Sequence, residues 1–546
     1  MILKPIRISR RHLLFSVLII LGSMLFLKPI QSFAFQDSCA TPIVNSPSGP
    51  VCGAQVNLPG GGQANAYRGI PFAESTAFPN RWKPPVAKAV WSETFLATDY
   101  GAPCPQLGVK SYSEDCLSLN IWTPTEDVIT NAGAGLPVMV FIYGGSFTSG
   151  DAATPMYNGA YIAASKNLIV VNLNYRLGAL GFLAAEGLNG NYGFLDQQLG
   201  LKWVQQNISS FGGDPERVTI FGESAGAMSV GLHLLSAPDS KPLFHAGIME
   251  SNLLSLPYKS LADQRNVGDL FKQAVNCRDV SCLEQTGVGK LLLVQATFTP
   301  EMSQIFSGPK YYLPFAPAID GDVIVEQPIE AVGNPENMNK PIIIGTNKNE
   351  GVTFVRDRSI KPEKYATWMA NIFGEKFQRV IEQYPSKQLA SNSALWARVQ
   401  TEDFFHCSTR WFLKQASAPV FGYYFDHQPS FNIYGTSIEN CAKDDNVCHA
   451  VELPFVFNTA SLMHESFTED EKKLSHQMID YWTNFAIYLN PNGGGGGDNP
   501  EWPHFQESTK QYMEFNLPVS SVVTDPYEEE CDFWDSIGYN LVSPWQ

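Results

Sequence analysis

The stretch from Thr219 to Ser229 combines a buried strand, a serine between glycines and a helix rich in small residues. Within it, residues 222–226 have the Gly-x-Ser-x-Gly spacing of a serine held at a sharp strand-to-helix turn. Such a turn exposes the Ser224 hydroxyl as a nucleophile, and the first helical turn offers backbone N–H groups to a developing anion. Because a bare Gly-x-Ser-x-Gly often marks only a glycine-rich turn, the remaining chain must supply a base, an acid and an oxyanion hole.

A glycine-rich segment upstream of the serine could supply that oxyanion hole. Acyl transfer needs backbone N–H donors aimed at the tetrahedral oxyanion. Tyr143-Gly144-Gly145-Ser146-Phe147 follows a strongly apolar run and fits a loop of this kind. We predict that Gly145 and Ser146 donate two amides and that Ala225 donates a third. The alternative is a tight turn without a function.

The base is expected to be a histidine downstream of the serine, and the acid a carboxylate that follows a buried strand. His449 lies in a loop before an apolar run, whereas His406 and His427 are weaker candidates. Glu350 comes just past the apolar residues 342–345, where α/β enzymes carry functional loops. The alternative for Glu350 is a solvated loop carboxylate. The chain order Ser224, Glu350, His449 is the Ser…Asp/Glu…His order of α/β-hydrolases.

The elements that must position these residues follow from the apolar pattern. From Pro137 onward, continuous apolar runs alternate with helical stretches, which predicts a large, mostly parallel sheet flanked by helices. The predicted strands are residues 137–143, 168–175, 217–221, 246–250, 341–345 and 420–425. Residues 37–110 predict short strands and loops, and residues 113–122 end in the alternation of a strand with one exposed face. Residues 255–335 and 355–415 are more helical and could form a pocket.

Composition limits the classes of protein. The chain has 546 residues, of which 44% are hydrophobic and 12% aromatic, and a formal net charge of −16. The length allows two or three average domains, but large α/β enzymes can fold as one, and we expect a single domain over residues 35–546. The negative charge argues against nucleic acid or an anionic membrane as a partner.

Residues 1–34 have the composition of a secretory signal peptide. A basic stretch, residues 4–11, precedes the apolar run from Leu13 to Leu27, and residues 32–34 offer small side chains at a cleavage site. Because the run is short for a membrane span, a cleaved signal is favoured over an anchor. Residues 9–14 also faintly resemble a twin-arginine signal, so the export route stays open. We expect a secreted or periplasmic protein with no stable membrane span.

Ten cysteines follow the predicted signal, an even number that favours disulfides in an exported chain. No Cys-x-x-Cys pair is present, so a zinc or redox site is disfavoured, and the sequence requires no metal or organic cofactor. Spacing leaves the connectivity open. Cysteines that are neighbours in the sequence form these possible pairs: Cys39 with Cys52, Cys104 with Cys116, Cys277 with Cys282, and Cys441 with Cys448, which leave Cys407 and Cys531.

The chain resembles the type-B carboxylesterase/cholinesterase family of α/β-hydrolases over nearly all of residues 40–530. The matching blocks are residues 67–73, 113–122, 143–150, 174–178, 190–196, 211–215, 221–226, 347–351 and 449–457. The resemblance implies an α/β-hydrolase fold with an N-terminal β-rich extension, and a catalytic triad of Ser224, Glu350 and His449. The remaining positions that it implies are the oxyanion donors Gly145, Ser146 and Ala225, the ion pairs Arg81–Glu114 and Arg176–Asp196, and the disulfides Cys104–Cys116, Cys277–Cys282 and Cys407–Cys531. Pairing Cys39 with Cys52 and Cys441 with Cys448 extends this set.

The resemblance implies a carboxylesterase that cleaves small-molecule or lipid esters through an acyl-enzyme. We expect Glu223 and Phe147 to border the substrate, although Glu223 could instead be a buried, hydrogen-bonded carboxyl. The segment between Cys104 and Cys116 contains no tryptophan, so the cation–π partner that cholinesterases offer to choline is missing and acetylcholine is not expected. Ser146 occupies a position where the family usually has a third glycine.

Several alternatives stay open at this point. The enzyme could be a lipase or thioesterase that acts on longer acyl chains, or the chain could be a non-catalytic, cholinesterase-like binding protein. The sequence does not identify the natural ester, the oligomeric state or the host. Asn207-Ile208-Ser209 is a glycosylation acceptor only if the host is eukaryotic and its helix exposes the asparagine.

Overall fold

The computed structural model describes residues 39–539, apart from residues 59–60, 132, 134, 306–308, 356–358, 387–390, 436, 443–444 and 494–498. The predicted signal peptide, residues 1–34, therefore lies outside the described residues. Within the described part, none of the helices combines the length and the apolar character that crossing a membrane requires.

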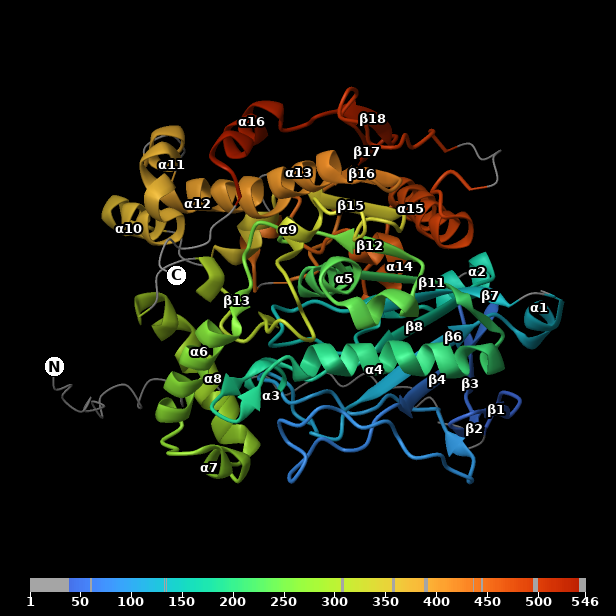
Figure 1. Ribbon diagram of the computed structural model, residues 1–546. Coiled ribbons are helices and arrows are strands. Elements are labelled where there is room, and N and C mark those ends of the chain that lie inside the picture. Colours follow the sequence, from blue (N-terminus) through green and yellow to red (C-terminus); the bar gives the residue numbers. More distant parts are fainter. Residues whose placement is uncertain are drawn as a thin grey trace, which may run out of the picture. The chain divides into compact units, whose positions relative to one another are not determined.

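A large mixed sheet forms the centre of the fold (Figure 1), and its strands have the order β18-β17-β16-β15-β12-β11-β7-β8-β6-β4-β3. In this spatial order, neighbouring strands from β17 through β8 pair in parallel. The pairs at the two ends, β18 with β17 and those among β8, β6, β4 and β3, are antiparallel. In Figure 1 the blue N-terminal strands and the red C-terminal strands lie at opposite edges of this sheet. Its strands are β3 (Ala54–Asn57), β4 (Gln63–Pro71), β6 (Ser118–Thr123), β7 (Leu136–Ile142), β8 (Ile169–Leu173), β11 (Gly213–Glu223), β12 (Ala246–Glu250), β15 (Ile342–Asn347), β16 (Val420–Phe425), β17 (Gln511–Phe515) and β18 (Ser521–Thr524).

This architecture confirms the predicted α/β-hydrolase fold. Every residue of β7, β8, β12, β15 and β16 is buried, as expected for parallel strands that are covered on both faces. Small β-pairings complete the structure, and three of their strands lie in the predicted β-rich N-terminal part. They are β1 (Val44–Ser46), β2 (Gly49–Cys52), β5 (Phe95–Leu96), β9 (Ala184–Ala185), β10 (Leu188–Asn189), β13 (Lys259–Ser260) and β14 (Ala318–Ile319).

The α-helices follow the strands or form the more helical regions predicted after residue 255. They are α1 (Glu126–Asn131), α2 (Ala160–Lys166), α3 (Gly178–Phe182), α4 (Tyr192–Asn207), α5 (Ala225–Leu235), α6 (Leu261–Ala274), α7 (Val280–Glu284), α8 (Val288–Ile305), α9 (Pro328–Ala331), α10 (Pro362–Phe373), α11 (Phe377–Gln383), α12 (Asn392–Gln400), α13 (Ser408–Gln415), α14 (Leu453–Phe457), α15 (Glu469–Tyr488) and α16 (Glu528–Ile537). A π-helix, η7 (Thr401–Cys407), joins α12 to α13, and a 3-10 helix, η5 (Glu350–Phe354), follows β15.

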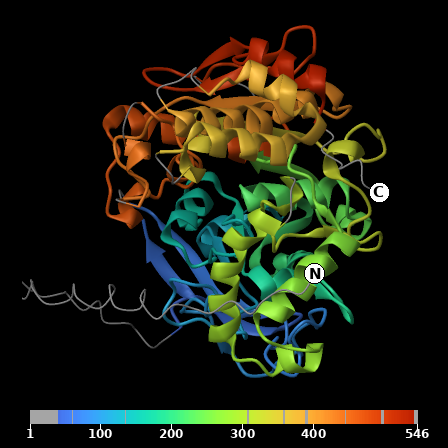
Figure 2. The ribbon, with the colours of Figure 1, turned by 90° about the vertical axis from the view of Figure 1, so that its left-hand side faces the viewer.

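The N-terminal segment packs beside α7, as Figure 2 shows for the blue chain and the yellow-green helices. Arg81 makes this contact, because its guanidinium donates to the carbonyls of Glu284 and Thr286 at 2.8 and 2.7 Å. The same group pairs with Glu114 at 2.6 Å. Arg81 therefore joins its own segment to Glu114, 33 residues later, and to the end of α7, 203 residues later.

The prediction that residues 113–122 end in a strand with one exposed face is wrong. Every residue of β6 is buried, so both faces of this strand are covered, and its edges pair with β4 and β8. Its polar positions are satisfied internally: Asn120 donates to Asn172 at 2.8 Å and accepts the amide of Gly69 at 2.8 Å. Alternating polarity here marks buried hydrogen bonds and not contact with water.

Five disulfides join all ten cysteines: Cys39–Cys52, Cys104–Cys116, Cys277–Cys282, Cys407–Cys531 and Cys441–Cys448. Four of them close short loops, whereas Cys407–Cys531 spans 124 residues.

Asn207 does not meet the exposure that glycosylation needs. Its side chain is 1% exposed, accepts from the amide of Ser48 at 3.0 Å and donates to the carbonyl of Trp203 at 2.9 Å.

Candidate active site

Ser224 is the single residue between the end of β11 and the start of α5, and its backbone is held in an unusual conformation. Its φ is +57° and its ψ −124°, a region that residues with a side chain rarely adopt. Its amide donates to the carbonyl of Glu250, on the neighbouring strand β12, at 2.9 Å. A side chain forced into this conformation at the carboxyl end of a parallel strand is the geometry of a nucleophile elbow.

The flanking glycines allow the turn to press against β7. A Cβ at Gly226 would lie 1.9 Å from the carbonyl oxygen of Ile142, and a Cβ at Gly222 would lie 2.6 Å from the same atom. Distances of this size exclude any side chain, so glycine is required at both positions of the motif. The Gly-x-Ser-x-Gly spacing therefore reports close packing of the elbow on β7.

Residues 143–150, which we call the glycine loop, follow β7 and lie against the elbow. A Cβ placed on Gly144 would be 2.8 Å from the Ser224 Cβ and 2.9 Å from Glu223 Oε2. Within the described residues, the structure records no acceptor for the N–H groups of Gly145, Ser146 or Ala225. Three unengaged amides next to a serine can stabilise an oxyanion.

Ser146 has a φ of +55°, in the left-handed region that favours glycine. We expect Ser146→Gly to raise the free energy of unfolding by about 0.5–1 kcal/mol, because relief of the left-handed strain exceeds the extra chain entropy of glycine. Urea unfolding measures the change. Ser149→Gly is the control in the same loop, since Ser149 has no positive φ and should lose stability. Equal losses in both variants would contradict the prediction.

Glu350 and His449 meet although 99 residues separate them in the chain. His449 Nδ1 lies 2.5 Å from Glu350 Oε2, and both side chains are buried. The other carboxylate oxygen of Glu350 accepts from the Ser251 hydroxyl at 2.6 Å and from the Asn347 amide at 2.7 Å. These bonds fix the carboxylate, so it can orient the imidazole and stabilise its cation.

The other ring nitrogen of His449 faces Glu223. Nε2 lies 2.9 Å from Glu223 Oε1, an ion-pair distance, and neither atom takes part in a hydrogen bond within the described residues. Burial alone would lower the pKa of His449, but the nearby carboxylates of Glu223 and Glu350 outweigh it and hold this pKa well above its ordinary value. The structure records no hydrogen bond between the Ser224 hydroxyl and Nε2. The bonds of a resting catalytic site often tighten only when a substrate binds.

Two further buried carboxyls border this group, and the sequence analysis missed both. Glu452 accepts from the side-chain amide of Asn347, and Glu250 accepts from Trp482 Nε1 at 2.5 Å. Burial, together with the neighbouring carboxylates, raises the pKa of each. The signal for Glu452 was its position three residues after His449, almost one helical turn away. Ser251, which holds Glu350, gave no recognisable signal.

Aromatic side chains enclose the imidazole. The ring centroids of Phe354, in η5, and Phe405, in η7, lie 5.0 and 5.3 Å from that of His449. Phe147, in the glycine loop, is fully buried and packs edge-on against Phe182, with centroids 5.3 Å apart. The weaker histidine candidates lie elsewhere: His406 contacts Thr346 at 2.7 Å, and His427 contacts Glu471 at 3.1 Å.

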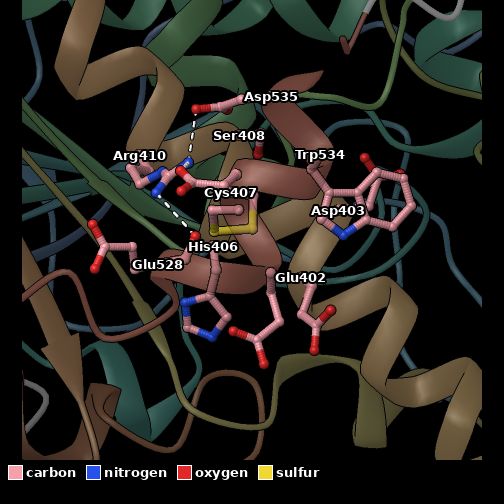
Figure 3. The surroundings of a disulfide bond; sticks show 12 residues. Glu402, Asp403, His406, Cys407, Ser408, Arg410, Glu528, Trp534 and Asp535 are labelled. Carbon is pink, nitrogen blue, oxygen red and sulfur yellow. Dashed lines mark hydrogen bonds and ion pairs between the residues drawn. A yellow bond between two sulfur atoms is a disulfide. The ribbon is translucent and has the colours of Figure 1, made fainter. Parts of the chain in front are cut away.

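The π-helix that carries Phe405 is fixed to the C-terminal helix α16. Figure 3 shows Cys407 joined to this helix through its disulfide, while Arg410 reaches Asp535. Arg410 is fully buried and pairs with Asp525, Asp532 and Asp535 at 2.7–2.9 Å. A second buried ion pair joins Arg176, after β8, to Asp196, in α4, at 2.7 Å. In the described part of the chain, no cluster of His, Cys, Asp and Glu could hold a metal ion.

Comparisons with known proteins find relatives over most of the chain. The model of the family described as "Carboxylesterase family" matches residues 40–534. The chain is 32% identical to acetylcholinesterase of Electrophorus electricus, over 89% of this chain and 87% of that protein, and 34% identical to "Crystal protein" of Dictyostelium discoideum, over 87% and 88%. The solved structure "PNB esterase" superposes with a TM-score of 0.77 at 31% identity and covers 90% of this chain and 99% of its own.

Proposed function

Because this chain belongs to the carboxylesterase family, we propose that it is a serine hydrolase that cleaves carboxylic esters through an acyl-enzyme. The observation that carries the proposal is the convergence of three separate segments at one edge of the sheet. These are the strained serine after β11, the glycine loop with unengaged amides, and the Glu350–His449 pair. A fold alone does not imply an activity, so the site must carry the argument.

In the proposed reaction, the Ser224 oxygen attacks the ester carbonyl while His449 Nε2 takes the hydroxyl proton. Glu350 holds the imidazole through Nδ1 and stabilises the cation that forms. The amides of Gly145, Ser146 and Ala225 bind the oxyanion of the tetrahedral intermediate. The alcohol leaves with the proton from His449, and a water molecule then repeats the same steps on the acyl-enzyme to release the acid.

The charge of Glu223 has a defined place in this scheme. Its carboxylate lies against Nε2, where the positive charge of the protonated imidazole develops. An anion there favours the imidazolium that forms in the transition state, and raises the pKa of the base. We propose that Glu223 tunes the site electrostatically and that its side chain borders the bound ester.

We also propose that the protein is exported. Five disulfides support this, because disulfides persist in oxidising compartments and are rare in the cytosol. The apolar segment that would direct export, residues 13–27, lies outside the described residues.

Hydrolysis of p-nitrophenyl esters from acetate to palmitate by the folded protein tests the proposed function. We expect turnover that is highest for short or medium acyl chains. A maximum at long chains would favour a lipase. If a folded sample turned over none of these esters, the esterase proposal would fail, and a non-catalytic binding function would be the better interpretation of this site. One of the similar proteins, "Crystal protein", has a name that states no activity.

A further inference from the structure

Gln106 makes a paired contact with the end of the glycine loop, and we propose that it is a positioning residue that holds this loop for oxyanion binding. The inference rests on the proposed esterase function and goes beyond the triad and the oxyanion donors. Gln106 lies in the short loop closed by Cys104–Cys116, and its side chain is 4% exposed. It contributes no atom to the reacting groups.

Both polar atoms of the Gln106 side chain bind the same residue of the glycine loop. Nε2 donates to the carbonyl of Gly150 at 2.7 Å, and Oε1 accepts from the Gly150 amide at 3.0 Å. Nε2 also donates to the carbonyl of Cys104 at 3.2 Å, which ties the glutamine back to its own disulfide loop. A buried side chain that satisfies both the N–H and the C=O of one residue fixes its position and its peptide orientation.

Gly150 transmits this position to the amides. A Cβ on Gly150 would lie 2.4 Å from the Tyr143 ring and 2.6 Å from the carbonyl oxygen of Gly144, so the end of the loop packs directly on its beginning. Within the loop, the carbonyl of Gly145 accepts the amides of Thr148 and Ser149, each at 3.0 Å. A shift at Gly150 would therefore reach Gly145 and Ser146, whose N–H groups take no part in these internal bonds.

Two other bonds from described residues outside the loop hold its backbone, and neither involves Gly145 or Ser146. The Tyr175 hydroxyl donates to the carbonyl of Tyr143 at 2.8 Å, and the Gly178 amide donates to the carbonyl of Phe147 at 2.7 Å. Gly145 and Ser146, the two proposed donors, lie between these two anchors and make no backbone bond of their own through N–H. Preorganised donors are worth far more than mobile ones, because they need no reorganisation when the charge develops.

Two variants separate the bonds from the volume. Gln106→Met has a similar size and removes all three hydrogen bonds. Gln106→Glu keeps the acceptor for the Gly150 amide but places a second oxygen against the carbonyls of Gly150 and Cys104. Gln205→Met is the control, since Gln205 also binds two backbone carbonyls, those of Pro215 and Leu243 at 2.8 and 3.0 Å, in a part of the fold that the proposal does not involve.

The first measurement is amide hydrogen exchange of peptides that cover residues 143–150, and it needs no turnover. We expect exchange in this segment to rise at least fivefold in both Gln106 variants and to stay unchanged in Gln205→Met. If the segment exchanges as in the wild type, Gln106 does not hold the loop and the inference is wrong. This arm decides the inference even if the wild type hydrolyses no ester.

The second measurement compares the ground state with the transition state. We expect kcat for p-nitrophenyl esters to fall by about 10- to 100-fold, somewhat less than the loss of one oxyanion donor, with KM within twofold. The inhibition constant of an aryl trifluoromethyl ketone, whose adduct with serine carries an oxyanion, should rise in parallel. Lower stability toward urea with unchanged kcat and inhibition would show a purely structural role and overturn the inference.

Discussion

Ser224→Ala is expected to lower kcat/KM for p-nitrophenyl esters by about a millionfold, the scale of loss when the nucleophile of a serine hydrolase is removed. Without the hydroxyl no acyl-enzyme forms, and the remaining amides and the imidazole stabilise only a direct attack by water. The fold should persist. The amide of residue 224 still donates to Glu250, and alanine carries the same Cβ that the elbow already accommodates.

A second serine provides the control for this variant. Ser236 follows α5, and its buried hydroxyl has no hydrogen-bond partner among the described residues. Ser236→Ala should therefore retain full activity and stability. The measurement is the steady-state rate with a short-chain ester, together with urea unfolding of both variants. Turnover by Ser224→Ala above one per cent of wild type would exclude Ser224 as the nucleophile.

Glu350→Gln is expected to lower kcat by about 10⁴-fold while the fold is retained, as when an amide replaces the acid of a Ser-His-Asp triad. The amide oxygen can keep the bonds from Ser251 and Asn347, whereas the amide nitrogen would face Nδ1. An N–H donor there favours the tautomer with its proton on Nε2, and a protonated Nε2 cannot accept the proton of Ser224.

The pH dependence gives this variant a second readout. The base must be neutral, so activity rises with pH through the pKa of His449. Glu350 is one of two carboxylates that raise this pKa, and its removal should move the acid limb of the residual activity to lower pH. Glu471→Gln is the control, because Glu471 is a buried carboxylate whose partners, Thr468, Ser430 and His427, do not include His449. Activity of Glu350→Gln within tenfold of wild type, with an unmoved acid limb, would remove Glu350 from the triad.

Local patterns in the sequence determined the elements of this fold with little error. The strands β12 and β16 have the bounds that their apolar runs predicted, and the other core strands differ by a few residues at their ends. Such strands are readable because burial on both faces requires continuous apolar residues. β6 misled the prediction, because Asn120 finds its partners across the sheet, and the sequence does not show which strands are neighbours.

The sequence also determined which residues to suspect, since Ser224, Glu350 and His449 each follow a predicted strand in an ordered motif. The glycines of the elbow could be named from the spacing, although the distances that require them come from β7. The catalytic roles of these residues stay predictions, which the two variants above test. What the structure adds is the contact between Glu350 and His449 and the position of Glu223 against the same ring.

Only the tertiary structure decided how the site is supported. Ser251 and Gln106 carry no motif, and only its spacing from His449 marked Glu452. Each of the three acts through a partner far away in the chain. The parallel sheet brings the carboxyl ends of β7, β11, β12 and β15 to one edge, and the loops that follow them meet there. A hydrogen bond over such a separation depends on the path of the whole backbone, whereas a strand or a turn depends on its own few residues.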